Sequence, residues 1–155
     1  MEEAEAFLQV SSGDRLHALF AVGVALGLRK GELLGLRWVD VDVDAGMLRV
    51  RHTIQRIHGA GMVTGPPRSL RSRRDIPLPA YAAGVLREYR VRQAEERLAL
   101  GPYREDRGLV FTSTVGTAID PRNLTRVLDE LFERSGVRRI RFHDMRHTCA
   151  SLLLA

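Results

Sequence analysis

Two segments far apart in the chain carry the residues best suited to chemistry. Residues 27–32 contain Arg29, and residues 143–147 contain His143 and Arg146. An arginine guanidinium stays charged at any working pH, and its planar fork of N–H donors matches phosphate oxygens two at a time. Two such forks with a histidine beside one of them predict a clamp for a phosphodiester.

A carboxylate lies close to the first arginine in the sequence. Glu32 follows Arg29 by three residues, a spacing that lets two side chains pair when the segment is helical. We expect Glu32 to hold the arginine in orientation. An ordinary surface ion pair, which contributes little to stability, is the alternative. Arg37 lies in the same segment and could take either role.

The basic residues are numerous and clustered. The formal net charge is +5, and Lys30 is the only lysine among 24 basic residues. A GC-rich genome explains the preference for arginine, but it does not explain the clusters at 68–74 and 138–141. Such clusters are typical of polyanion binding, whereas a solvated basic face is the alternative. The charge pattern therefore favours a nucleic acid as a partner, and double-stranded DNA is the form that we expect.

Metal and disulfide chemistry have little support. Cys149 is the only cysteine, so neither a disulfide within the chain nor a thiolate metal site is predicted. We expect a packed core residue there, with a catalytic cysteine as the minor alternative. Residues 40–46 have the Asp-x-Asp-x-Asp-x-Gly pattern of a calcium loop, but Arg51 stands where the closing glutamate belongs.

The location predicted from the sequence is cytoplasmic. No apolar run approaches the roughly 20 residues of a membrane span, so no membrane partner is expected. Residues 1–5 are acidic and polar, unlike a signal or transit peptide.

The elements that position these residues are predicted from periodicity. One domain with a real core is expected at 155 residues. Apolar stripes predict helices at 2–9, 16–28, 80–100 and from Asp120-Pro121 to Ser135-Gly136, with a last one after Phe142. A period-two pattern predicts a strand over residues 48–55, a returning strand at 62–64 and an edge strand at 74–79. The predicted fold class is α+β, mostly helical, with a small antiparallel sheet.

Five stretches together resemble one family. They are ALGLRKGELLGLRWVD (25–40), RDIPL (74–78), GLVFT (108–112), DPRN (120–123) and FHDMRHT (142–148). In this order they are similar to the catalytic domain of the tyrosine recombinases, or phage-type integrases. The resemblance covers nearly the whole chain and implies a mostly helical domain with a small three-stranded antiparallel sheet.

The resemblance also implies a reaction. A tyrosine phenol attacks a DNA phosphodiester, forms a 3′-phosphotyrosine link and releases a 5′-hydroxyl that attacks the partner strand. No metal, ATP or other cofactor is implied, because the bond energy is kept in the covalent link.

Residue roles follow from the matching motifs. Arg29 and Arg146 would bind the non-bridging oxygens and stabilise the charge of the transition state. His143 would assist proton transfer or donate to the same phosphate. Glu32 would support Arg29, and His147 would be structural. Further DNA contacts are expected from the basic clusters, at Arg71, Arg73, Arg74 and Arg141.

The chain departs from the family pattern in three ways. Arg68 stands at the position that matches the family's proton-donating lysine, and an arginine is a poor proton donor. The later histidine or tryptophan motif is absent. The nucleophile is absent as well, because Tyr81, Tyr89 and Tyr103 all precede His143.

These departures lead us to expect that residues 1–155 are a single partial catalytic domain. The amino-terminal DNA-clamping domain and the carboxy-terminal tyrosine segment would be absent. The uncapped apolar residues 152–155 favour a chain cut in mid-fold, whereas their packing on the existing core is the alternative.

Two functions from different classes remain open at this stage. The first is the DNA-binding catalytic domain of a site-specific recombinase or integrase, which is not competent alone and forms a homo-oligomer on DNA when completed. The second is a non-catalytic, degenerate DNA-binding fragment. A fragment that does not fold stably is a third, lower option.

Overall fold

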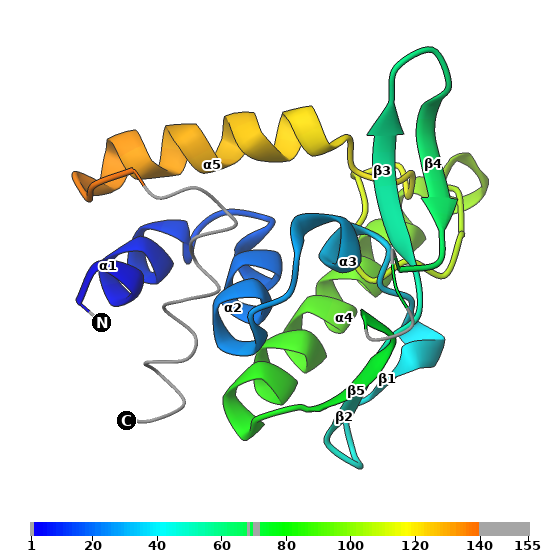
Figure 1. Cartoon of the computed structure of the whole chain (residues 1–155), viewed down its shortest axis with the longest axis horizontal. Coiled ribbons are helices and arrows are strands. Elements are labelled where there is room, and N and C mark those ends of the chain that lie inside the picture. Colours follow the sequence, from blue (N-terminus) through cyan, green and yellow to red (C-terminus); the bar gives the residue numbers. More distant parts are fainter. Residues whose placement is uncertain (1, 68, 70–71, 140–155) are drawn as a thin grey trace.

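The computed structural model describes residues 2–67, 69 and 72–139 of the chain (Figure 1). Its α-helices are α1 (Glu2–Ser11), α2 (His17–Leu26), α3 (Lys30–Leu34), α4 (Ala80–Leu100) and α5 (Pro121–Ser135). Two short 3₁₀ helices, η1 (Trp38–Asp40) and η3 (Gly101–Tyr103), follow α3 and α4. In Figure 1, α5 runs along one side of the molecule over α1, α2 and α3.

The strands form two separate antiparallel units. Strands β1 (Val41–Asp42), β2 (Met47–Val50) and β5 (Arg74–Pro77) make a three-stranded sheet in the order β1-β2-β5. Strands β3 (Thr53–Ile57) and β4 (Gly61–Gly65) make a hairpin that stands where α5 begins (Figure 1). The mostly helical α+β fold with a small three-stranded antiparallel sheet, and the edge position of β5, are thereby confirmed.

One predicted strand is wrong. Residues 48–55 do not form a continuous strand, because the chain leaves the first sheet after Val50 and enters the hairpin at Thr53. The alternation of burial stops at the same point: Leu48 and Val50 are each at most 3% exposed between exposed neighbours, whereas Thr53 and Ile54 are buried consecutively, at 8% and 2% exposed. An alternating pattern reports which side of the strand is buried, but it cannot report a change of hydrogen-bonding partner.

Two glycines let α3 lie directly against residues 52–54, where the chain passes from β2 into β3. A Cβ at position 35 would come within 2.8 Å of the carbonyl oxygen of His52. A Cβ at position 31 would lie 3.0 Å from the carbonyl oxygen of Ile54. A Cβ at position 35 would clash with this backbone and one at position 31 would make a tight contact, so the two glycines allow α3 to lie against β3.

Helix α5 begins and ends where its sequence predicts. The Asp120 carboxylate accepts a hydrogen bond of 2.9 Å from the Arg122 N–H, and Pro121 occupies the first helical position. Gly136 ends the helix with a φ of 66°. The buried side chains are Leu124, Leu128, Leu131 and Phe132.

An aromatic cluster joins three helices in the core. The ring of Phe7 in α1 stacks on that of Phe132 in α5, with centroids 4.7 Å apart. The same ring meets Phe20 of α2 edge-on, at 5.5 Å between centroids. Such ring pairs stabilise a core beyond the area that they bury, so α5 is anchored firmly on α1 and α2.

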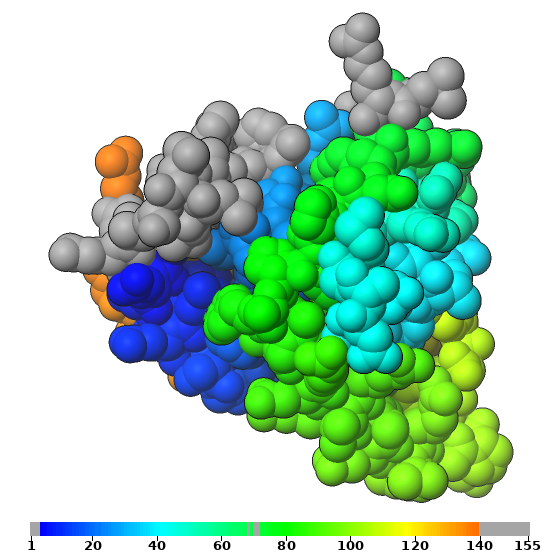
Figure 2. Space-filling model, turned by 90° about the horizontal axis from the view of Figure 1, so that it is seen from below, coloured from blue at the N-terminus to red at the C-terminus, as the bar shows by residue number. Residues whose placement is uncertain are grey.

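The long helix α4 supports the sheet on another face of the molecule. In Figure 2, α4 (green) lies beside strands β1 and β2 (cyan). An exposed ion pair of 3.4 Å joins Arg87 of α4 to Asp44 in the β1–β2 turn.

In the described part of the chain, no helix is both long and apolar enough to cross a membrane.

Candidate functional site

A cleft of about 590 Å³ lies between α3, strand β3 and the start of α5. Pro67 and Ser72, from the connection between β4 and β5, close its rim. Among the described residues, four charged ones line the cleft: Arg29, Lys30, Glu32 and Arg56. Residues 29–32 of the first predicted motif therefore line a cavity.

Arg29 lies just before α3, so it is not part of the helical turn that a side-chain pair with Glu32 would need. Its backbone is extended (φ −70°, ψ 151°), and its N–H donates a hydrogen bond of 2.9 Å to Glu32 Oε1. The carboxylate of Glu32 thus caps the first turn of the helix and fixes the point from which the Arg29 side chain departs. The guanidinium itself is exposed, and no carboxylate in the described part of the chain pairs with it.

The carboxylate of Glu32 pairs with a different arginine. Arg74 Nη1 donates to Glu32 Oε2 at 2.9 Å, and Arg74 Nη2 donates to Oε1 at 3.3 Å. Arg74 Nη1 also donates to the Ser72 carbonyl at 2.8 Å. The Glu32 side chain is 2% exposed, and the pair joins α3 to β5. The expected support of Arg29 by Glu32 is therefore made through the backbone, and the Glu32–Arg29 side-chain pair does not form.

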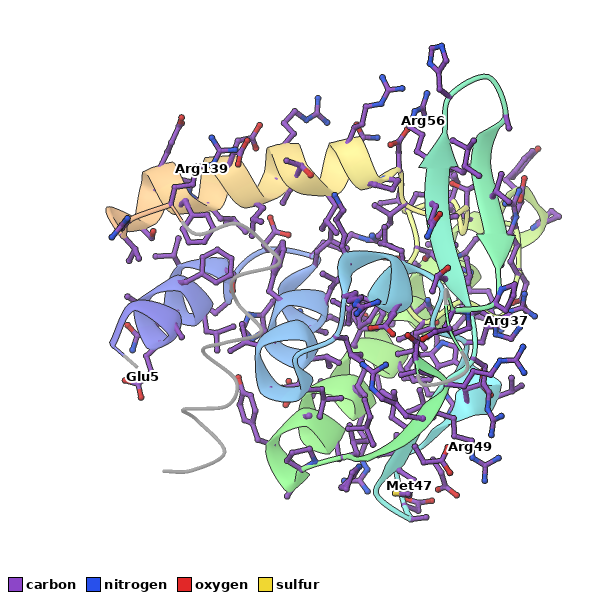
Figure 3. The ribbon with its side chains drawn as sticks, in the orientation of Figure 1. Glu5, Arg37, Met47, Arg49, Arg56 and Arg139 are labelled. Atoms are coloured by element: carbon purple, nitrogen blue, oxygen red, sulfur yellow. The ribbon has the colours of Figure 1, made fainter. Side chains whose placement is uncertain are left out.

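A second carboxylate near the cleft is occupied as well. Arg56 of β3 donates to Asp120 Oδ2 at 2.5 Å, while Asp120 Oδ1 caps α5. Figure 3 shows Arg56 on the hairpin beside the start of α5. Because Glu32 and Asp120 are both engaged, Arg29 and Lys30 remain as cations of the cleft without a carboxylate partner among the described residues. This surplus of positive charge favours an anion in the cleft.

The tyrosines lie away from the cleft. Tyr89 is 5% exposed, and its ring packs against Phe111 with centroids 5.3 Å apart. Burial raises the pKa of the Tyr89 phenol, which disfavours the phenolate that a nucleophile needs. Tyr81 and Tyr103 are exposed near the two ends of α4. None of the three lines the cleft as the described residues form it.

The remaining predicted residues divide into two groups. Arg73 is exposed, and Arg37, whose Nε is buried, does not line the cleft or compete for Glu32. The others lie outside the described residues, namely Arg68, Arg71, Arg141, His143, Arg146, His147 and Cys149. Among the described residues, His, Cys, Asp and Glu side chains form no group that could hold a metal ion.

A family model provides the deciding comparison. The model of the phage integrase family matches residues 1–155. The chain belongs to the phage integrase family.

Curated relatives of this phage integrase chain carry matching names. It is 36% identical to "Tyrosine recombinase XerC-like" of Caldanaerobacter subterraneus subsp. tengcongensis, over 98% of this chain and 42% of that protein. It is 32% identical to an integrase of Streptomyces ambofaciens, over 97% of this chain and 40% of that protein. The chain thus spans less than half the length of either relative.

Solved structures share the fold of this phage integrase domain. XerA recombinase matches 99% of this chain and 49% of its own, with a TM-score of 0.74 and 24% identity. The Tn1549 transposon integrase, solved in complex with a circular intermediate DNA, matches 97% of this chain and 50% of its own, with a TM-score of 0.77 and 20% identity. These likenesses confirm the tyrosine-recombinase catalytic-domain fold.

Proposed function

We propose that this chain forms part of the catalytic domain of a site-specific tyrosine recombinase or integrase, and that its cleft binds a phosphodiester of duplex DNA. One observation carries the proposal: Arg29 lines the cleft and is fixed at its backbone by a buried carboxylate, while its exposed side chain has no carboxylate partner among the described residues. A charged fork held in this way is suited to bind phosphate oxygens.

The proposed role of Arg29 is to stabilise charge on the phosphate during strand exchange. As the phosphorus becomes five-coordinate, negative charge grows on its non-bridging oxygens, and donors already in place stabilise that charge without reorganising. The Glu32–Arg74 pair keeps α3 against β5, so Arg29 approaches the phosphate from a rigid support. His143 and Arg146 are proposed to complete the phosphate site, with His147 as a structural neighbour.

The nucleophile is proposed to come from a polypeptide segment other than residues 1–155. The phenol of that tyrosine gives up its proton as its oxygen forms a bond to phosphorus, the bond from phosphorus to the 5′-oxygen breaks, and the departing oxygen takes up a proton. The arrangement of the cleft supports this assignment, since Tyr81, Tyr89 and Tyr103 do not line it among the described residues. Assembly of several copies on DNA remains a prediction.

The same observation favours a second function, that of a DNA-binding module that cuts nothing. A cleft with surplus cations but without a tyrosine would still hold a phosphate backbone. The two functions differ only in whether a covalent protein–DNA link can form.

Two measurements on a nicked duplex separate these functions. The 155-residue chain should bind the duplex with strong salt dependence and little preference for sequence, and it should leave no denaturant-resistant protein–DNA adduct. A longer version that carries the tyrosine segment should leave such an adduct. Binding by both versions without any adduct would support the second function, and binding indifferent to salt would contradict both.

A further inference from the structure

Lys30 is the only lysine of the chain, and it lies in the cleft beside Arg29. It is the first residue of α3 and is half-buried. Arginine holds the other 23 of the 24 Lys and Arg positions, so a lysine at this point is a chemically distinct group: a compact ammonium with three rotatable donors on a flexible stem.

The position of the ammonium is set by α5. Lys30 Nζ lies 3.4 Å from Thr125 Oγ1. Thr125 donates its own hydroxyl hydrogen to the Pro121 carbonyl at 3.0 Å, so its oxygen acts as the acceptor for Lys30. At 3.4 Å this is a long hydrogen bond, so the Lys30 side chain lies toward α5 without a strong partner for its ammonium.

No stronger partner competes for this ammonium within the described part of the chain. Among those residues, Lys30 forms no ion pair, and the Asp120 carboxylate at the start of α5 is held by Arg56 and the Arg122 N–H. One of the three ammonium donors has a weak acceptor, which leaves two for a ligand. A half-buried cation of this kind gains more from an anion than a solvated surface lysine does.

We infer that Lys30 binds a second DNA phosphate, adjacent to the phosphate at Arg29 on the same strand. Arg29 has an extended backbone, and Lys30 is the first residue of helix α3. The Lys30 side chain extends to Thr125 of α5. The two cations therefore occupy different parts of one cleft, as consecutive phosphates of a strand require. This inference rests on the proposed function and adds to it the residue that sets the path of the strand along α5.

The single lysine permits a direct test. An amine-selective acetylating reagent has two targets in this chain, Lys30 and the α-amino group, which serves as the internal control. With saturating duplex DNA, acetylation of Lys30 should slow several-fold while the α-amino group keeps its rate, as read by mass spectrometry of peptides. Unchanged rates at Lys30, in a sample whose duplex is shown to be bound, would overturn the inference and leave the proposed function standing.

Substitutions at Lys30 give an independent measurement. Lys30→Ala should reduce the slope of log affinity against log salt by about one, so that its affinity deficit shrinks about threefold between roughly 50 and 200 mM salt. Lys30→Arg should retain the slope. Arg134→Ala, at the far end of α5, removes the same charge and should not change the slope. Equal slopes for Lys30→Ala and Arg134→Ala would overturn the inference, and an absence of duplex binding by the unsubstituted chain would overturn the proposed function with it.

Discussion

At the scale of single residues, the spacing of Arg29 and Glu32 identified the correct pair but not the atoms that interact. The carboxylate binds the Arg29 N–H and the guanidinium of Arg74, so the Arg29 fork keeps its charge for a ligand. No local spacing links positions 32 and 74, because their meeting depends on how α3 packs beside β5. Arg74, predicted as a DNA contact, thus has its guanidinium engaged with Glu32.

Replacing Glu32 with glutamine should destabilise the fold through the loss of its pair with Arg74. The glutamine oxygen can still accept from the Arg29 N–H, but its amide N–H₂ would face the donors of Arg74. We expect the free energy of unfolding to fall by about 1–3 kcal/mol, the range for buried hydrogen bonds to charged groups. Urea titration measures this loss.

Glu130→Gln is the matched control, since Glu130 is exposed on α5. Its free energy of unfolding should change by no more than about 0.5 kcal/mol. If the two substitutions have equal effects, the buried Glu32 carboxylate does not have the supporting role described here.

At the scale of elements, the long helices were predictable and the sheet pairing was not. Helices α4 and α5 are predictable because their signals are local in the sequence. These signals are the apolar stripe within each helix, the proline at the start of α5 and the glycine after each helix. The break between β2 and β3 depends instead on the approach of Gly35 to His52, a contact between distant segments. For the same reason no local pattern predicts that Arg56 of the hairpin meets Asp120 of α5.

Asp120 should stabilise the fold mainly as the cap of α5. Asp120→Ala removes the cap and the ion pair with Arg56, and it should lower the free energy of unfolding by about 1 kcal/mol or more. Asp120→Asn keeps a good capping residue and loses only the partly exposed pair, which contributes about 0–1 kcal/mol.

Arg56→Ala is the companion variant, because it removes the ion pair and leaves the cap intact. Its loss in denaturant titration should match that of Asp120→Asn. A loss for Asp120→Asn as large as that for Asp120→Ala would show that the ion pair, and not the cap, is the main contribution.

At the scale of the whole molecule, the core holds α5 in place at one end of the helix and the cleft lies at the other end. The Phe7–Phe20–Phe132 cluster anchors α5 on α1 and α2, and the other end of α5 helps to form the cleft. The sequence predicted the basic character of the molecule. It did not predict that Glu32 pairs with Arg74 and Asp120 with Arg56, which leaves Arg29 and Lys30 as the cleft cations without a carboxylate partner in the described part of the chain. That distribution, more than the net charge of +5, supports a phosphate site.

The most direct test of this account compares two arginines in duplex binding across a salt series. Arg29→Ala should weaken binding roughly tenfold or more, as expected for the loss of a charged hydrogen bond to phosphate, and should reduce the salt slope by about one. Arg126→Ala removes the same charge from an exposed position of α5 outside the cleft and should have little effect. Equal losses from the two substitutions would mean that general basicity holds the DNA and would contradict the assignment of the cleft.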